Sequence, residues 1–329
     1  MPKSYNQKMK ILYIMKALFE KSDENHVLST EELIKEVNRY GIKAERKSIY
    51  DDIEALRLYG MDIISRRERP AGYYLASREF ELPELKLLVD AVQSSKFITY
   101  KKSKELINKL EGLASKYDAR QLHRQVFVAN RIKTMNESIY YNVDKIHNAI
   151  SNNVKISFQY YEWTVTKEMR LKRDGEQYII SPWALSWDDE NYYLIGYDEG
   201  ASMIKHYRVD KMLNIVFMES ERVGREYFEN FNTADYTNKT FGMFGGKDKI
   251  VELIFKDQFI GVVIDRFGKD IPVIKQEEHR FKARVNIALS SQFYGWVTGI
   301  GEGVEIAGPP EVVNEYKEFL EFIIDKYRQ

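Results

Sequence analysis

The sequence predicts an α+β protein of several domains, and three observations carry this prediction. The 329 residues exceed what one ordinary core needs. Hydrophobic spacing is helical up to about residue 123, and then changes to short strand-like runs that later alternate with helices. We expect a winged helix-turn-helix over 1–78, a helical linker over 79–140, a small bent β-sheet or barrel over 141–222, and a C-terminal α/β sandwich over 247–329.

Composition excludes several classes of site. Lys plus Arg equals Asp plus Glu at 50 each, so net charge gives no global attraction to nucleic acid. Cysteine is absent, which removes disulfides, thiolate metal sites and cysteine nucleophiles. The five histidines are far apart and no Ser-His-acid order appears. We therefore expect no metal, no cofactor and no enzymatic activity.

The hydropathy pattern predicts a cytoplasmic protein. The segment MPKSYNQKMK lacks the apolar stretch of a secretory signal, and no run of about 18 apolar residues occurs. We expect no association with a membrane.

The first 78 residues have the order of a winged helix-turn-helix. KMKILYIMKALFEK has helical spacing, and LSTEELIKEVNRYG begins with a capping signal at Ser29 or Thr30 and ends at Gly41. RKSIYDDIEALRLYG is a third helix that closes at Gly60, and DIISRRERPAGYYLAS forms two short strands around a turn. A helix of this size fits the major groove, and a wing reaches the phosphates beside it.

Basic and polar residues gather where such a domain would meet double-stranded DNA. The alternative is a small helical bundle with a solvated charged face, and the acids Asp51, Asp52 and Glu54 are expected to face the rest of the domain or solvent. The predicted DNA contacts lie at the start of the third helix and at the tip of the wing: Lys43, Arg46, Lys47, Ser48, Tyr50, Arg66, Arg67 and Arg69.

The linker and the last third of the chain are predicted from their apolar spacing. EFELPELKLLVDAVQSS and KKSKELINKLEGLASKY are helical, residues 124–140 leave strand and loop open, and a short helix begins at Asn142. After a junction that ends in FGMFGGKD, strands and helices alternate from KIVELIFK to a last helix with Pro310 in its first turn. The junction lacks the spacing of a phosphate-binding loop.

The middle segment contains five strand-like runs: 154–161, 168–173, 176–187, 191–198 and 201–218. Within ENYYLIGYD, Tyr192 and Leu194 share one face, and Tyr193 and Ile195 share the other, so both faces are at least partly covered.

Cationic and aromatic residues lie close together in this segment. His206 and Arg208 share one face of their strand, and Arg170 and Lys172 are on a preceding one. Aromatic rings stack on bases and arginine binds phosphate, so the pattern suits a nucleotide or single-stranded nucleic acid. The alternative places Tyr193 and Tyr197 in the core, with His206 satisfied on an edge strand.

These parts, taken in order, resemble the WYL-domain transcriptional regulators of bacteria. Tyr192-Tyr193-Leu194 stands where the family has Trp-Tyr-Leu, and the run from Arg208 to Met212 is similar to the family's Arg-Leu-Asp-Arg-Ile. The upstream run from Ser181 to Leu185, which contains Trp183, is similar to the family's proline-containing strand. In the head, Ser48 to Ile53 and Gly72 to Leu75 resemble the family's recognition helix and wing.

The resemblance implies an SH3/Sm-like WYL domain that senses a ligand, and a regulator that binds a DNA operator as a homodimer. The implied effector is a phosphate-bearing nucleotide or nucleic-acid fragment, contacted by Tyr192, Tyr193, His206, Arg208, Arg170, Lys172 and Trp183. Tyr192 in place of Trp and Asp51 in place of an Arg depart from the family pattern. A nucleic-acid-processing accessory enzyme and a non-sensing interaction scaffold stay as alternatives.

Overall fold

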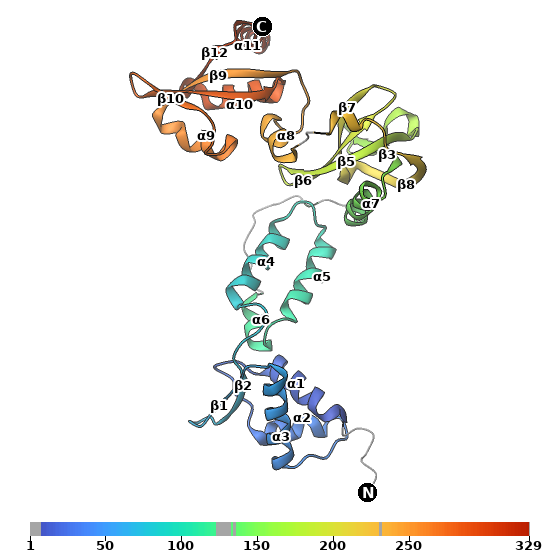
Figure 1. Ribbon diagram of the computed structural model, residues 1–329, viewed down its shortest axis with the longest axis vertical. Coiled ribbons are helices and arrows are strands. Elements are labelled where there is room, and N and C mark those ends of the chain that lie inside the picture. The colour runs from blue at the N-terminus through green and yellow to red at the C-terminus, as the bar shows by residue number, and fades with distance from the viewer. Residues whose placement is uncertain (1–7, 123–132, 134–135, 230–231, 329) are drawn as a thin grey trace. The chain divides into compact units, whose positions relative to one another are not determined.

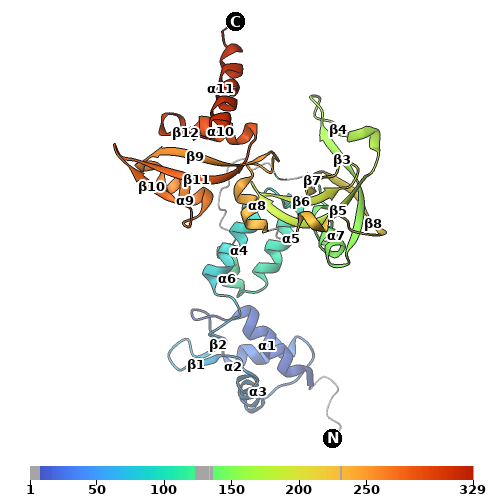
Figure 2. The ribbon, with the colours of Figure 1, turned by 45° about the horizontal axis from the view of Figure 1, so that its top comes forward.

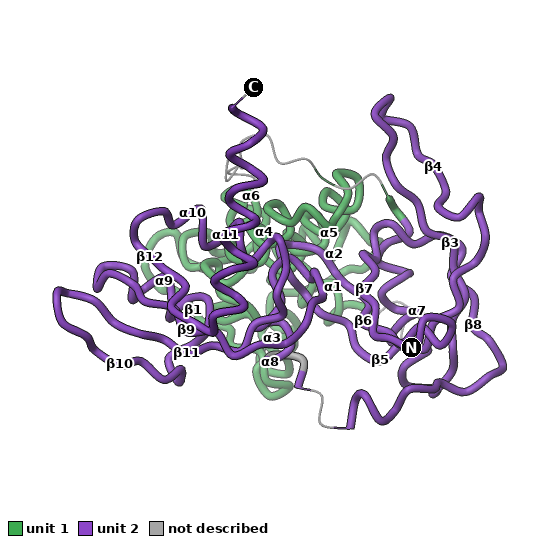
Figure 3. Tube along the Cα trace, turned by 90° about the horizontal axis from the view of Figure 1, so that it is seen from above, with its two compact units in different colours: residues 1–137 green, residues 138–329 purple. Residues whose placement is uncertain are grey.

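The structure is a computed structural model that describes residues 8–122, 133, 136–229 and 232–328. The chain divides into two compact units, Met1–Glu137 and Ser138–Gln329 (Figure 3). Each unit is described on its own. Most of the stretch 124–140, for which strand and loop stayed open, lies outside the described residues, and its last residues begin a helix.

The first part of unit 1 has three helices and a β-hairpin at the predicted places (Figure 1). Ser29 and Glu32 form the expected capping box, and Gly60 ends the third helix with a φ of 110°. Gly72 is required because a Cβ there would lie 2.5 Å from the carbonyl oxygen of Leu28. The elements are α1 (Lys10–Lys21), α2 (Thr30–Asn38), α3 (Arg46–Tyr59), β1 (Ile63–Arg66) and β2 (Gly72–Leu75).

The three helices enclose one apolar core. Ile14, Leu18, Leu33, Val37 and Ile49 are fully buried in it. The antiparallel hairpin joins this core through Ile63 and Leu75, which pair across the two strands. Helical periodicity alone therefore accounts for which face of each helix is buried.

The rest of unit 1 is helical, as predicted. Thr99 caps one of these helices by accepting a hydrogen bond from the backbone of Lys102. Leu85, Val89 and Leu122 form a small separate core. The helices are α4 (Leu82–Ser94), α5 (Tyr100–Glu111) and α6 (Lys116–Leu122).

Unit 2 begins with a helix and a curled antiparallel sheet (Figure 2). The strand order is β4-β3-β5-β6-β7, and β8 also pairs with β3, with bulges in β5 and β8. The elements are α7 (Ile139–Ser151), β3 (Val154–Trp163), β4 (Met169–Leu171), β5 (Tyr178–Asp188), β6 (Asn191–Asp198), β7 (Met203–Arg208) and β8 (Met212–Glu221).

The run 201–218, expected as one strand, is two. A 3₁₀ turn at Val209–Lys211 separates β7 from β8. β7 pairs with β6 at one end of the strand order, whereas β8 pairs with β3. One straight strand cannot reach both partners, so the turn redirects the chain and buries Val209 and Met212 on the way.

Aromatic rings fill the interior of the curled sheet. Phe158 stacks on Tyr178 at 5.5 Å between ring centroids, and Tyr207 meets both rings edge-on. Tyr160 packs among the same rings. Burial raises the pKa of Tyr160 to about 12. These tyrosines support the sheet from inside.

The C-terminal part is an α+β sandwich. Its sheet is antiparallel in the order β10-β11-β9-β12, and the chain runs βαββαβ, which is the ferredoxin-like topology. Val251, Leu253 and Phe255 alternate along one strand and face the core. The elements are α8 (Thr233–Lys239), which precedes the sandwich, β9 (Asp248–Lys256), α9 (Ile260–Phe267), β10 (Val273–Gln276), β11 (Arg280–Ala288), α10 (Ser291–Ile300), β12 (Val304–Gly308) and α11 (Pro310–Asp325), with Pro310 in the first turn as expected.

Among the described residues, no helix combines the length and the apolar character needed to cross a bilayer.

Candidate functional site

The outward face of α3 presents an unpaired cation. The helix buries Ile49, Ile53 and Leu56, and its period of 3.6 residues therefore exposes Lys47 and Tyr50. Within the described part of the chain, the Lys47 ammonium has neither an ion pair nor a hydrogen bond. Its charge is open to a partner outside this unit.

Two other predicted contacts at the start of α3 are engaged locally. Arg46 forms an exposed ion pair with Glu31 of α2. Ser48 donates its hydroxyl to the carbonyl oxygen of Glu45 at 2.9 Å, which secures the first turn. Lys43 is exposed in the connection that precedes the helix. Exposed ion pairs contribute little stability, so Arg46 can exchange Glu31 for another anion.

The hairpin carries the three arginines expected at its tip. Arg67 and Arg69 are exposed in the turn between β1 and β2. Arg66 donates to the backbone carbonyl of Glu24, and its guanidinium lies 5.8 Å from the centre of the Tyr74 ring. The tip is therefore cationic, and Arg66 is its most constrained residue.

Arg57 fixes the hairpin to α3. Its Nε donates to the carbonyl oxygen of Ile63 and its Nη2 to the hydroxyl of Ser65, both at 2.8 Å. Its Nη1 lies 2.5 Å from a carboxylate oxygen of Glu54 on the same helix. One guanidinium thus holds the basic start of α3 and the basic hairpin in a fixed relation.

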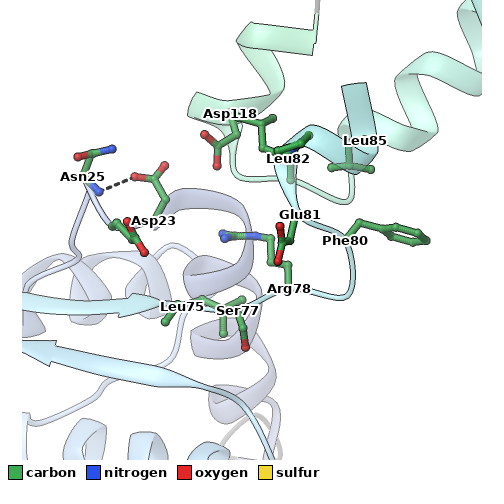
Figure 4. A pocket seen from close by; sticks show the side chains of 14 residues that line it. Asp23, Asn25, Leu75, Ser77, Arg78, Phe80, Glu81, Leu82, Leu85 and Asp118 are labelled. Carbon is green, nitrogen blue, oxygen red and sulfur yellow. Dashed lines mark hydrogen bonds between the residues drawn. The ribbon is translucent and has the colours of Figure 1, made fainter. Parts of the chain in front are cut away.

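Unit 1 also contains a cavity of about 500 Å³ between the hairpin end and the start of α4 (Figure 4). Arg78 lines it and donates to the carbonyl oxygens of Phe19 and Ser22 at the end of α1. Ser115 Oγ lies 2.8 Å from Asp23 Oδ2. Although burial acts to raise the pKa of Asp23, hydrogen bonds from Ser115 and its neighbours hold it below the usual value. This network joins the end of α1 to Arg78, which precedes α4, and to Ser115, which precedes α6.

In unit 2, Arg208 is bound through its Nε and Nη2 by groups of the fold itself. Its Nε and Nη2 lie 3.0 and 2.9 Å from the two carboxylate oxygens of Asp210, and Nη2 donates to Asn191 at 2.8 Å. Its backbone N–H donates to the Tyr160 hydroxyl. Tyr193 is its cross-strand partner and is half-buried. The structure therefore brings Tyr193 and Arg208 together, but the guanidinium of Arg208 binds the carboxylate of Asp210.

Tyr192 and Trp183 lie in other surroundings. The Tyr192 ring meets Trp187 edge-on at 4.7 Å. The Trp183 indole donates to the carbonyl of Val223, stacks on Phe228 at 5.0 Å and is covered by the Arg222 guanidinium at 4.1 Å.

Arg170 and Lys172 share one partner on the neighbouring strand. Glu162 lies 2.5 Å from Arg170 Nη2 and 3.4 Å from Lys172 Nζ. Hydrogen bonds from Arg170 and Lys172 lower the pKa of Glu162, so it stays ionised and neutralises part of their charge. This exposed cluster is separate from the ring stacks around Trp183 and Trp187.

His206 lines a cavity of about 920 Å³ in unit 2. Its Nε2 lies 2.8 Å from the Tyr236 hydroxyl of α8, and burial lowers the pKa of His206 below its usual value. Three lysines surround the same cavity, namely Lys205, Lys239 and Lys247. Lys205 and Lys239 pair with Asp198 and Asp248, at 2.6 and 2.5 Å.

A second cavity of about 620 Å³ adjoins the first, because Ile204, Tyr227, Tyr236 and Lys239 line both. Tyr227 is exposed on one side and stacks on Tyr197 on the other. We call these two adjoining cavities the α8 cleft. It combines cations and aromatic rings, which suit a base-bearing anion, with the carboxylates of Glu226, Asp235 and Asp248.

Sequence reasoning missed most of the α8 cleft. Tyr227, Tyr236 and Lys239 lie within the segment 219–246 that was interpreted as a junction, and Lys247 directly follows it. Their only sequence signal was the aromatic and polar composition of residues 219–246. Nothing in that composition shows that α8 packs against β5 and β11, which creates the cleft.

In the described ranges, no group of three or more acidic or histidine side chains could hold a metal ion.

Comparisons with known proteins give a domain match and two remote structural likenesses. None of the curated proteins compared matches the chain. Proteasome accessory factor B/C (PafBC) of Arthrobacter aurescens is 15% identical, with a TM-score of 0.29, over 100% of this chain and 51% of its own, so this chain spans about half its length. A structure titled as a CRISPR Cas-related protein is 14% identical, with a TM-score of 0.37, over 98% of this chain and 84% of its own.

A family model described as the WYL domain matches residues 141–217. This range runs from α7 through the curled sheet into β8, and includes Tyr193, His206 and Arg208. The chain therefore contains a WYL domain, built on α7 and the strands β3 to β8.

Proposed function

We propose that this protein is a DNA-binding transcription regulator whose WYL-containing unit responds to a phosphate-bearing effector. One observation supports the DNA part above others. The first turn of α3 carries the exposed, unpaired Lys47 and Arg46, whose ion pair is exposed. Arg57 of the same helix binds the hairpin that carries arginines at its tip. A helix and a hairpin arranged in this way fit the major groove and its flanking phosphates.

In this proposal, residues 1–78 are a winged helix-turn-helix with α3 as the recognition helix and β1–β2 as the wing. The helices of 79–140 form the linker, 141–222 the sensing domain and 247–329 the C-terminal domain. The protein acts as a homodimer on a near-palindromic operator. Exposed apolar residues of α11, among them Phe322 and Ile324, supply the dimer contact.

The effector of this proposal is a nucleotide or a nucleic-acid fragment held at the α8 cleft. His206 contributes from the expected set, and Lys247 adds a charge for a phosphate. Lys205 and Lys239 line the same cavity but pair with Asp198 and Asp248, so a phosphate must displace those carboxylates to reach them. Tyr193 and Arg208, which pair across β6 and β7, are not among the residues that line the cleft, and Asp210 and Asn191 bind the Arg208 guanidinium. The proposal therefore leaves both residues outside the effector site. Effector binding shifts the dimer between two geometries that differ in DNA affinity.

The first test is selection of duplex DNA from a random-sequence pool, followed by salt titration of the selected duplex. The change is Arg46→Ala with Lys47→Ala. Losing two phosphate contacts makes the negative slope of log binding constant against log salt shallower by about 1.8. It also weakens binding by about 10- to 100-fold. Lys109→Ala on α5 is the matched control, since it removes a cation away from α3.

A protein that selects no duplex at any salt concentration contradicts the proposal. Equal losses for the Arg46/Lys47 variant and for Lys109→Ala would show a non-specific charge effect instead of a recognition helix. Hydrolysis of the DNA during the selection would favour a nucleic-acid-processing enzyme.

A further inference from the structure

Three carboxylates lie within four residues of α3, Asp51, Asp52 and Glu54, and the fold accounts for two of them. Asp52 Oδ2 lies 2.8 Å from the Nζ of the buried Lys10, so Asp52 neutralises a lysine of α1. Glu54 is bound to Arg57, the residue that holds the hairpin. Asp51 is exposed, and in the described ranges it forms neither an ion pair nor a hydrogen bond.

Asp51 lies in the same outward row as Lys47. The two residues are four apart, which places them one turn from each other on one side of the helix. The opposite side is the buried row of Ile49, Ile53 and Leu56. Both positions fall in the N-terminal half of α3, the part of a recognition helix that reaches base edges.

A carboxylate on this face is repelled by the DNA phosphates unless it accepts a hydrogen bond from a base. The major-groove edge of cytosine presents the N4 amino group without a neighbouring acceptor. Adenine presents its N6 amino group beside the N7 acceptor, which repels a carboxylate. Guanine presents two acceptors, which suit the ammonium of Lys47 instead.

We infer that Asp51 reads cytosine in the major groove, with Lys47 contacting guanine beside it, so that each half-site contains G·C pairs opposite the start of α3. This inference rests on the proposed DNA-binding function and adds the base that the helix selects. Asp51 is then a specificity determinant, and Lys47 supplies both affinity and part of the base contact.

The chemistry also predicts how the preference changes. Asn in place of Asp presents one acceptor and one donor, the pair that matches N6 and N7 of adenine. Asp51→Asn should therefore move the preferred base from cytosine to adenine at one position of each half-site. Asp51→Ala should remove the preference at that position and leave the others in place.

The experiment is selection from a random duplex pool with the full chain as wild type, Asp51→Asn, Asp51→Ala and the control Asp62→Asn. Asp62 is an exposed carboxylate between α3 and β1, outside the outward row. The expected discrimination between cytosine and the other bases in the wild type is at least about fivefold. The control should select the same sequences as the wild type.

The outcomes separate the inference from the function on which it rests. A wild type that selects no duplex overturns the proposed function, and the inference falls with it. If the wild type selects a duplex, and Asp51→Asn and Asp51→Ala show the same base preferences as the wild type, the inference alone is overturned. The same holds if either variant loses duplex binding together with a lowered melting temperature, because Asp51 would then support the fold of the domain and not read a base.

Discussion

Lys47 on α3 and Arg208 on β7 were both expected to bind anions, and the fold treats them in opposite ways. Lys47 is exposed and unpaired among the described residues, whereas Arg208 has a bidentate partner in Asp210 and a further one in Asn191. A cation that is satisfied inside the fold contributes to stability. A cation left unsatisfied is available to a partner. Substitution should therefore affect folding at Arg208 and binding at Lys47.

The largest effect on stability is expected for Arg208→Ala. Removing the guanidinium leaves the largely buried Asp210 without its bidentate partner, which costs about 1–2 kcal/mol for a partly exposed pair. The free energy of unfolding can be followed by tryptophan fluorescence, since Trp163, Trp183 and Trp187 lie in the curled sheet.

Arg170→Ala is the control for this change, because its ion pair with Glu162 is largely exposed. We expect a loss well below that of Arg208→Ala. If Arg208→Ala left the unfolding curve unchanged and abolished only the response to effector, the contrast between the two cations would be wrong.

A smaller effect is expected at the α8 cleft. Lys239→Ala with Lys247→Ala removes two cations from the cavity that contains His206. Binding of a short 5′-phosphorylated single-stranded oligonucleotide, measured by fluorescence anisotropy, should weaken by about tenfold. Lys256→Ala, on the C-terminal sheet and outside the cleft, should bind as the wild type does. If the double variant binds the oligonucleotide with the same affinity as the wild type, the effector site is not at the α8 cleft.

The smallest effect concerns pH. Burial lowers the pKa of His206 below 6.5, so the unfolded chain binds more protons than the folded one as pH falls below 6.5. Stability of unit 2 should therefore decrease as pH falls from 6.5 towards the folded pKa. His206→Gln should flatten this dependence in unfolding measurements at several pH values, whereas His147→Gln, at an exposed position of α7, should not. An unchanged slope in His206→Gln would mean that another group titrates.

Local signals predicted the elements of the chain well. The capping box at Ser29, the left-handed Gly60 and the first-turn Pro310 each mark a boundary by chemistry confined to a few residues. Alternation along ENYYLIGYD predicted that both faces of the strand are covered, and Leu194 and Ile195 are fully buried on opposite faces. The break between β7 and β8 was missed because it depends on which strands β7 and β8 pair with.

The sequence by itself determined most helix boundaries, which faces are apolar and which residues carry charge, because these depend on neighbours within a few positions. Only the tertiary structure decided which charges are satisfied. Asp210 reaches Arg208 across a turn, Lys10 reaches Asp52 from another helix, and α8 brings Lys239 to the cavity that His206 lines. An ion pair forms where the chain folds two side chains to within a few ångströms, and spacing along the sequence does not fix that distance.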